Sequence, residues 1–562
     1  MIDTSARNND NSGAGSSYTK VNQVYLTLLT LVAALGGLLF GYDTAVVNGA
    51  EKSLTALYIT PITASGHGDY AVAMITQYKT LLIIVLFIVL LVISGQIFKL
   101  WGSAKGGLVA VLMLAALAIW AIGFVGHPIP TAAADLQDTA DAIKGFVIAS
   151  ALIGCVIGGA TAGFLSKSIG RKNGLLLSAV CFFVSAIGAW RPESFNFFGT
   201  LDVYSFVVYR IIGGIGVGIA SMISPMYIAE IAPARIRGKL VSFNQLAIIS
   251  GMLIIYFVNY AIARQGNEQW LITEGWRWMF FSGVIPAGVF FVLLFFVPET
   301  PRYLAMKGRH DKALLVLQKI AGKEQAEGTL RDIQSTLHEK NAPWLSYGFF
   351  LIFIGILLSV FQQFVGINAV LYYASNIFRN MGASTDSSLL QTIIVGIVNG
   401  VFTVVAILTV DKFGRKPLMI IGSIGMAVSM FALGFAFYSG NVGMVALIFM
   451  LTYTAAFAMS WGPVCWVLLA EIFPNSIRGA LSIAVAAQWI ANWVVSLTFP
   501  MMNDNHALNE KFHHGFAYWI YGVMGVVSAI FMWKLVPETK GKTLEQIEGL
   551  WKKRSPRDVS TK

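Results

Sequence analysis

Fourteen long apolar segments divide this chain, and they restrict it to a membrane fold. Each is close to the roughly 20 residues that an α-helix needs to cross a bilayer. Only 12% of the residues are charged, against roughly 25% in soluble proteins, so water cannot be the solvent for most of the surface. We therefore predict an all-α membrane protein. The candidate crossings are residues 24–50, 79–97, 106–125, 146–166, 173–190, 205–228, 240–262, 277–297, 347–373, 387–409, 417–438, 443–469, 480–501 and 516–536.

Basic residues gather in the short loops between these segments and in the C-terminal tail. If both termini lie on the same side, these loops share that side, and positive loops mark the cytoplasmic face. We expect a multi-pass protein of the cell membrane (the inner membrane in a Gram-negative bacterium) with both termini cytoplasmic. This also accounts for the net charge of +11 without nucleic acid. The basic residues are Lys167, Arg171, Lys172, Arg235, Arg237, Lys239, Lys412, Arg415, Lys416, Lys552, Lys553 and Arg554.

Three different motifs recur in the same order about 240 residues further along, so the chain contains an internal repeat. The repeat predicts two related bundles, and alternating access between such halves is the design of many transporters. We expect bundles at 23–301 and 345–540, a cytoplasmic linker with short helices at 302–344, a disordered cytoplasmic tail at 1–22 and a second cytoplasmic tail at 541–562. The repeated pairs are 169–172 and 413–416, 229–238 and 470–479, and 298–300 and 537–539.

Five stretches resemble the sugar-porter branch of the major facilitator superfamily, and in particular the bacterial D-xylose–proton symporters. They read GGLLFGYD at 36–43, YRIIGG at 209–214, FQQFVGIN at 361–368, WGPVCW at 461–466 and PETKG at 537–541. The resemblance implies the major facilitator fold, in which two six-helix bundles are related by a pseudo-two-fold repeat. It also implies secondary transport of a monosaccharide together with a proton. We expect a monomer in the lipid bilayer, without a cofactor.

The chain departs from this family in an insertion at about 55–140, where relatives have a modest loop. The insertion holds two apolar runs joined by a turn at 98–105 that carries two lysines and no acid. Because two added crossings preserve the orientation of every later segment, we predict an extra transmembrane hairpin at about 79–125, either a neutral addition or a surface for a partner. A second departure is Gly283 in the sixth family helix, where xylose symporters can carry a Glu.

A sugar presents hydroxyl groups and flat C–H faces, which suit amide side chains and aromatic rings respectively. An unpaired amide at membrane depth costs about 1–3 kcal/mol, so a set of amides there indicates a binding site, with helix–helix hydrogen bonding as the alternative. Helical spacing alone does not bring Gln362, Gln363 and Asn368 to one face, but a helix break at Gly366 could. The residues that match the family's sugar-contact positions are Gln245, Gln362, Gln363, Asn368, Asn399 and Gln488, with Phe40, Tyr372, Phe457, Trp466 and Trp489.

Asp43 and Arg210 are the charges deepest in apolar sequence. A charge at mid-bilayer costs roughly 2.5–3.5 kcal/mol, so we expect the two to pair. An Asp beside an Arg can change its protonation when the contact breaks, and we predict that this pair couples transport to protons. A purely structural pair is the alternative. In the resembling family, proton-driven members keep an acid here, whereas facilitators tend to carry an amide.

Glutamate and arginine repeat together at the cytoplasmic ends of both predicted bundles. The orientation rule explains the arginines, but it does not explain two glutamates at duplicated helix ends. By resemblance to the family we predict a charge clamp that closes the inner gate. Its members are Glu230, Arg237 and Arg171 in the first bundle and Glu471, Arg478 and Arg415 in the second.

No constellation in the sequence suggests an enzyme or a metal site. Cys155, Cys181 and Cys465 lie in apolar segments without metal-ligand spacing. The glycine-rich run 213–218 sits inside an apolar segment rather than a βαβ unit, so we expect it to serve close helix packing. We predict a proton-coupled symporter for D-xylose or a similar aldose. A facilitative uniporter of the same fold stays open because of Gly283, and a non-transporting membrane sugar sensor is disfavoured by the short termini.

Overall fold

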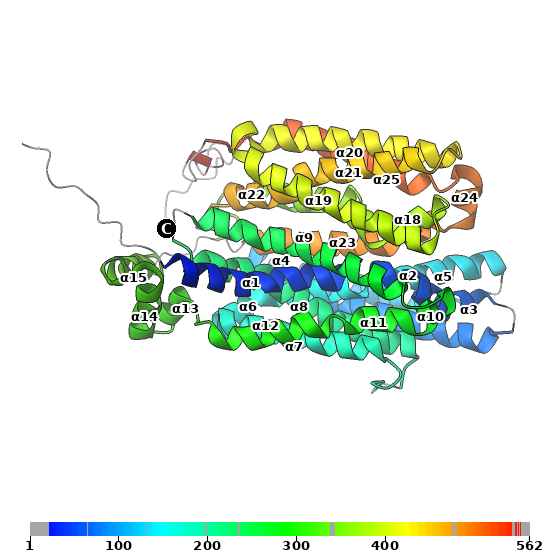
Figure 1. The fold of residues 1–562 in the computed structure, drawn as a ribbon, viewed down its shortest axis with the longest axis horizontal. Coiled ribbons are helices and arrows are strands. Elements are labelled where there is room, and N and C mark those ends of the chain that lie inside the picture. The colour runs from blue at the N-terminus through cyan, green and yellow to red at the C-terminus, as the bar shows by residue number, and fades with distance from the viewer. Residues whose placement is uncertain are drawn as a thin grey trace, which may run out of the picture.

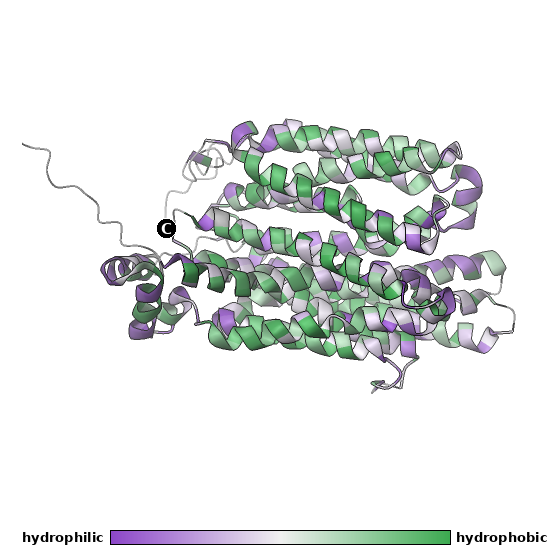
Figure 2. Ribbon diagram, in the orientation of Figure 1, coloured by the Kyte–Doolittle hydropathy of each residue, from purple (hydrophilic) through white to green (hydrophobic). Residues whose placement is uncertain are grey.

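All regular secondary structure in the described part of the chain is helical. The computed structural model describes residues 22–541 apart from 65, 131, 197–198, 234–235, 338–342, 475–476 and 478–479, and it adds residues 546, 547, 549 and 551. Fourteen helical segments are long and apolar enough to cross a membrane, so the predicted all-α architecture and number of candidate crossings are confirmed. Figure 2 shows apolar residues along the middles of these helices and polar residues towards both ends.

The N-terminal half comprises α1 to α12. Its first crossing is composite, because α1, α2, a π-helical turn at Thr55–Ile59 and α3 follow one another with little interruption. The helices are α1 (Gln23–Ala45), α2 (Val47–Leu54), α3 (Thr60–Thr63), α4 (Gly68–Gly126), α5 (Ala133–Ile148), α6 (Ser150–Ser168), α7 (Arg171–Trp190), α8 (Asp202–Ile231), α9 (Arg237–Ala263), α10 (Glu268–Trp270), α11 (Trp276–Phe281) and α12 (Val284–Phe296).

The C-terminal half comprises α16 to α25, and three short helices connect it to the first half. The connecting helices are α13 (Pro301–Met306), α14 (His310–Ala321) and α15 (Lys323–Leu337). The second half contains α16 (Phe349–Phe364), α17 (Ile367–Tyr372), α18 (Ala374–Asn380), α19 (Thr385–Phe413), α20 (Arg415–Tyr438), α21 (Met444–Met459), α22 (Pro463–Ile472), α23 (Leu481–Asn503), α24 (His506–Phe512) and α25 (Phe516–Leu535).

The two halves lie side by side with their long helices roughly aligned (Figure 1). They meet where α9 packs on α19 and where α23 packs on α5 and α6. Helices α13 to α15 project from one end of the molecule, which we call the linker end. Helices α3, α10, α18 and α24 lie at the opposite end, which we call the far end (Figure 1).

The glycine-rich run at 213–218 brings α8 into backbone contact with α6. A Cβ on Gly214 would lie 1.7 Å from the carbonyl oxygen of Ala151, and a Cβ on Gly218 would lie 2.5 Å from that of Cys155. Only a residue without a side chain fits such an approach. The prediction that this run serves helix packing is therefore confirmed.

Helix α4 is the predicted hairpin, folded back on itself at Gly102. Gly102 has φ 77° and ψ 178°, which breaks the helix into legs at Gly68–Gly102 and Ala104–Gly126. The second leg returns along the first, because Tyr78 contacts Phe124 and the Lys79 ammonium donates to the carbonyl of His127 at 2.6 Å. The hairpin packs on α3, α5 and α6 of the N-terminal half.

The outer leg of the hairpin presents exposed apolar side chains to its surroundings. Leu108 and Ile119, for example, are 63% and 74% exposed. In a membrane protein, lipid rather than water is the expected neighbour of such a surface. The hairpin also touches the C-terminal half, where the hydroxyl of Ser482 donates to the Gln96 side-chain oxygen at 3.3 Å.

Cysteine labelling can test the predicted orientation of this hairpin. Ala104 is exposed at the start of the second leg, two residues after the bend at Gly102, so an Ala104→Cys variant should resist a membrane-impermeant thiol reagent in intact cells and react in inverted vesicles. Ala64, exposed at the far end, provides the matched control, because an Ala64→Cys variant should label from outside. Labelling of the cysteine at 104 from outside would contradict the orientation derived from the basic loops.

Candidate functional site

Four of the predicted amide side chains, three of them buried, join in one hydrogen-bonded cluster in the C-terminal half. The Gln488 amide on α23 donates to the Gln362 side-chain oxygen, which also accepts from Gln363 at 3.2 Å. Gln362 in turn donates to the backbone carbonyl of Trp461 at 3.1 Å. Asn368 on α17 donates to the Gln363 side-chain oxygen. The cluster therefore presents donors and acceptors from three helices at one place.

A helix break at Gly366 brings Asn368 back to the glutamines. Helix α16 ends at Phe364, and α17 begins at Ile367 after Gly366 has adopted the left-handed conformation with φ 94°. A Cβ at Gly366 would also lie 2.6 Å from the ring of Tyr521, so glycine is required twice over. The predicted break is confirmed, and it explains how residues out of helical phase meet.

Aromatic side chains approach this region from both halves. The rings of Phe40 on α1 and Trp489 on α23 lie 5.4 Å apart at an angle of 51°. Tyr372 on α17 and Phe457 on α21 are buried, as is the amide of Asn399 on α19. The Phe40–Trp489 contact joins the two halves, so a ligand beside it would be touched by both.

Two predicted site residues stand apart from the amide cluster. Trp466 on α22 is 36% exposed, and Gln245 on α9 is partly exposed. Neither is hydrogen-bonded to the four clustered amides within the described residues. Both stay predictions as sugar contacts, as do the other residues of the set.

Asp43 and Arg210 form the predicted pair inside the N-terminal half. One guanidinium nitrogen donates to the Asp43 carboxylate at 2.8 Å, and another donates to the Asp43 backbone carbonyl at 2.8 Å. Arg210 is buried and lies over the ring of Phe280 at 5.2 Å. The second carboxylate oxygen of Asp43 is buried without a hydrogen-bond partner among the described residues. An acid held on one oxygen only is well placed to accept a proton on the other.

A small cavity adjoins Asp43, with a volume of about 10 Å³. Its lining includes Asp43, Phe280 and Gly283. This is near the smallest volume that can hold one water molecule. Gly283 contributes no side chain to it, so no acid from the sixth family helix accompanies Asp43 here.

The repeated Glu and Arg residues pair within each half at the linker end. In the N-terminal half, Arg171 binds Glu230 at 2.7 Å and Thr300 donates to the same Glu at 2.6 Å. In the C-terminal half, Arg415 binds Glu471 at 2.8 Å and Thr539 donates to it at 2.6 Å. The two clusters are thus copies of one another, as the repeat predicts.

A second acid in each cluster accepts hydrogen bonds from backbone N–H groups at the start of α7 or α20. Glu299 accepts from Arg171 and Lys172, and Glu538 accepts from Arg415 and Lys416. Burial raises the pKa of Glu299, while these N–H donors oppose the rise.

The charge clamp of the inner gate stays a prediction. Its four paired members bind partners in their own half, and Arg237 is exposed at the start of α9. Arg478 lies outside the described residues.

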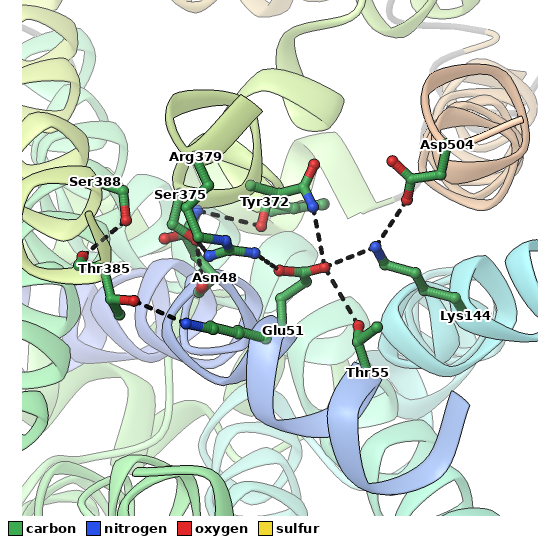
Figure 3. Close-up of polar contacts among 12 residues, drawn as sticks. Asn48, Glu51, Thr55, Lys144, Tyr372, Ser375, Arg379, Thr385, Ser388 and Asp504 are labelled. Carbon is green, nitrogen blue, oxygen red and sulfur yellow. Dashed lines mark hydrogen bonds and ion pairs between the residues drawn. The ribbon is translucent and has the colours of Figure 1, made fainter. Parts of the chain in front are cut away.

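Sequence reasoning missed a third charged cluster, at the far end. Glu51, Lys144, Arg379 and Asp504 meet there between the halves (Figure 3). One signal was available, because Lys144 is the single base in a segment with Asp135, Asp138 and Asp141 and lies just before a predicted crossing. Burial and the nearby Asp504 carboxylate raise the pKa of Asp141 to about 7.

Comparison with known proteins agrees with this architecture. The family model described as "Sugar (and other) transporter" matches residues 29–551. The D-xylose-proton symporter of Escherichia coli K12 is 50% identical over 97% of this chain and 99% of its own. The glucose facilitated diffusion protein of Zymomonas mobilis is 35% identical over 94% of this chain and 98% of its own.

A solved structure gives the same result for the fold. The E. coli xylose transporter XylE, in a partially occluded inward-open conformation, matches with a TM-score of 0.73 and 48% identity, covering 93% of this chain and all of that one. Since the family model spans nearly the whole chain and the sequence motifs agree, the chain belongs to the sugar-transporter family of the major facilitator superfamily.

Proposed function

We propose that this protein couples the uptake of a monosaccharide, D-xylose or a similar aldose, to proton entry by alternating access. The observation that carries the proposal is Asp43, a carboxylate inside a crossing helix that is 13% exposed, with one oxygen bound to Arg210 and the other buried without a partner among the described residues. A charge inside a crossing helix costs free energy, so such residues usually have a function. The 50% identity to a D-xylose-proton symporter over almost the whole chain supports both the sugar and the coupling ion.

The amide cluster supplies the chemistry for the sugar. The four amides are hydrogen-bonded to one another, and the Gln488 side-chain oxygen is buried without a hydrogen-bond partner among the described residues. A sugar hydroxyl group can donate to that oxygen, and other hydroxyl groups can replace bonds between the amides. The Phe40–Trp489 pair offers an apolar face beside them. Gln245, Asn399, Tyr372, Phe457 and Trp466 complete the proposed contact set.

We also propose domain boundaries, an oligomeric state and a membrane orientation for this protein. The two bundles are 23–301 and 345–540, the segment 302–344 is the linker, and 1–22 and 541–562 are tails. The protein works as a monomer in the cell membrane with the linker end and both termini in the cytoplasm. The Glu230 and Glu471 clusters then act in the inner gate, together with Arg237 and Arg478.

A facilitative uniporter of the same fold is the alternative, although the 50% identity to a proton symporter favours the proposal above. Gly283 removes an acid from the sixth family helix, and a glucose facilitated diffusion protein is among the relatives of this chain. The two functions differ in whether a pH gradient drives accumulation.

Transport by the purified protein in liposomes decides between the two functions. A panel of radiolabelled aldoses should be tested with and without an inward proton gradient. A symporter accumulates its sugar above the external concentration only with the gradient, and a uniporter equilibrates in both cases. Failure of every aldose in counterflow would contradict sugar transport itself. That result is the one expected of a non-transporting sugar sensor.

A further inference from the structure

The far-end cluster joins the two halves by ion pairs, and the coupling proposed above does not use it. Lys144 on α5 binds the carboxylate of Asp504, just after α23, at 2.8 Å. Glu51 on α2 binds Arg379 on α18. Each of these pairs has one member in the N-terminal half and one in the C-terminal half. Lys144 also binds Glu51 at 2.8 Å, so one ammonium group serves two carboxylates (Figure 3).

These are the two ion pairs that connect the halves within the described residues. At the linker end, the Arg171–Glu230 and Arg415–Glu471 pairs stay inside their own halves. Among the described residues, the ion pairs between the halves therefore lie at the far end.

Burial makes the cluster sensitive to the loss of any member. Glu51 is 1% exposed and Lys144 is 5% exposed. Glu51 also accepts hydrogen bonds from Asn376 and Thr55, both at 3.3 Å. Two acids and two bases balance in charge, but a buried charge that loses its partner is strongly destabilised and must regain water. Water is available to this cluster once the halves separate at the far end.

A row of neutral hydrogen bonds connects the cluster to the proposed sugar site. Asn48 on α2 donates to the backbone carbonyls of Leu371 and Tyr372 on α17, at 3.1 and 3.2 Å. Ser375 donates to the carbonyl of Asn48 at 2.8 Å. Helix α17 also carries Asn368 of the amide cluster, so separation of the halves here would release the helix that holds part of the site.

We propose that Glu51, Lys144, Arg379 and Asp504 form a latch that holds the far end shut, with Lys144 as its shared cation. The latch rests on the proposed function, because it matters only if the far end opens during alternating access. In this proposal, the four residues control the equilibrium between the conformations in which the far end is closed and open.

A distance measurement across the far end tests the latch directly. Spin labels on cysteines at Gln269 of α10 and Ala507 of α24, both exposed, report the separation of the halves by double electron–electron resonance in nanodiscs without sugar. Cys181 is replaced by Ser in this background, since it is partly exposed while Cys155 and Cys465 are buried. Lys144→Met should raise the ratio of open to closed distances on the order of tenfold, and Lys144→Arg, which keeps the cation, should stay closer to the unmutated protein.

A second variant keeps the test valid if Lys144→Met does not fold. The Asp504 side chain is 22% exposed, so Asp504→Asn is a milder change that should shift the same ratio by a few-fold. In the Lys144→Met background the Asp504 change should add almost nothing, since its partner is already gone. Fully additive shifts would overturn the role of Lys144 as the shared cation.

An ion pair within one half provides the matched control. Glu193 binds Arg277 at 2.9 Å, and both belong to the N-terminal half. Glu193→Gln should leave the distances unchanged. An unshifted distribution in both Lys144→Met and Asp504→Asn, or an equal shift in Glu193→Gln, would overturn the latch. Because neither sugar nor a proton gradient is present, this outcome is independent of whether the proposed substrate and coupling ion are correct.

Discussion

Replacing Asp43 by Asn should abolish the uphill accumulation of sugar under a pH gradient while exchange of sugar for sugar continues. The asparagine side-chain oxygen can still accept the hydrogen bond from Arg210, and the second Arg210 bond goes to the backbone carbonyl of residue 43, which the substitution leaves in place. The local fold is therefore retained. Because an amide neither takes up nor releases a proton near neutral pH, the protein should exchange sugar without proton coupling.

Paired counterflow and pH-driven uptake in proteoliposomes measure the two activities separately. With one proton per sugar, a gradient of one pH unit can drive at most about tenfold accumulation, and Asp43→Asn should reduce this to equilibration. Asp386→Asn makes the same chemical change at an exposed position in the first turn of α19 and should have no effect. Undiminished accumulation by Asp43→Asn would remove Asp43 as the coupling site. If the unmutated protein never accumulates sugar, the uniporter is the correct function.

Replacing Gln363 by Ala should weaken sugar binding by about ten- to a hundredfold. The substitution removes an amide that faces both Gln362 and Asn368, and it leaves the Asn368 amide without its acceptor. Loss of a buried hydrogen-bond partner costs on the order of 1–3 kcal/mol, which corresponds to that range of dissociation constants.

Equilibrium binding of radiolabelled sugar to the detergent-solubilised protein gives this value without transport. Gln391→Ala is the matched control, because Gln391 lies in the same half on α19 but lines a surface hollow near Ser384 and Gly443. It should bind sugar like the unmutated protein. Equal affinities of Gln363→Ala and Gln391→Ala would mean that the sugar site lies elsewhere.

The sequence was sufficient where one local signal determines the outcome. The length of the apolar segments predicted the crossings. The hairpin was predicted from the two lysines of the 98–105 turn and from the fact that two added crossings preserve the orientation of every later segment. Gly366 was a recognisable break between two amide-bearing segments, and the structure shows it in a left-handed conformation. The glycines at 213–218 likewise indicated close packing before any contact was known.

The far-end latch could not be predicted in the same way. Its four residues come from α2, α5, α18 and the segment after α23, and no repeat or spacing relates them. The linker-end clusters show a different limit. The duplicated motif identified Arg171, Glu230, Arg415 and Glu471 as a set, but a sequence shared by several conformations does not specify which partner each residue takes in any one of them.

The unequal legs of the α4 hairpin also bear on the thickness of the membrane. The first leg has 35 residues and the second 23, which at 1.5 Å per residue makes them about 50 and 35 Å long, against a hydrocarbon core of about 30 Å. The surplus of the first leg lies at the far end and is fixed to the start of α8, where Tyr204 donates to the carbonyl of Met74 at 2.6 Å and the Leu201 backbone donates to Gln77 at 2.9 Å. A long helix usually relieves hydrophobic mismatch by tilting. This leg is held by protein at its outer turns, so in bilayers of different thickness the lipid should deform around the hairpin while its tilt stays constant.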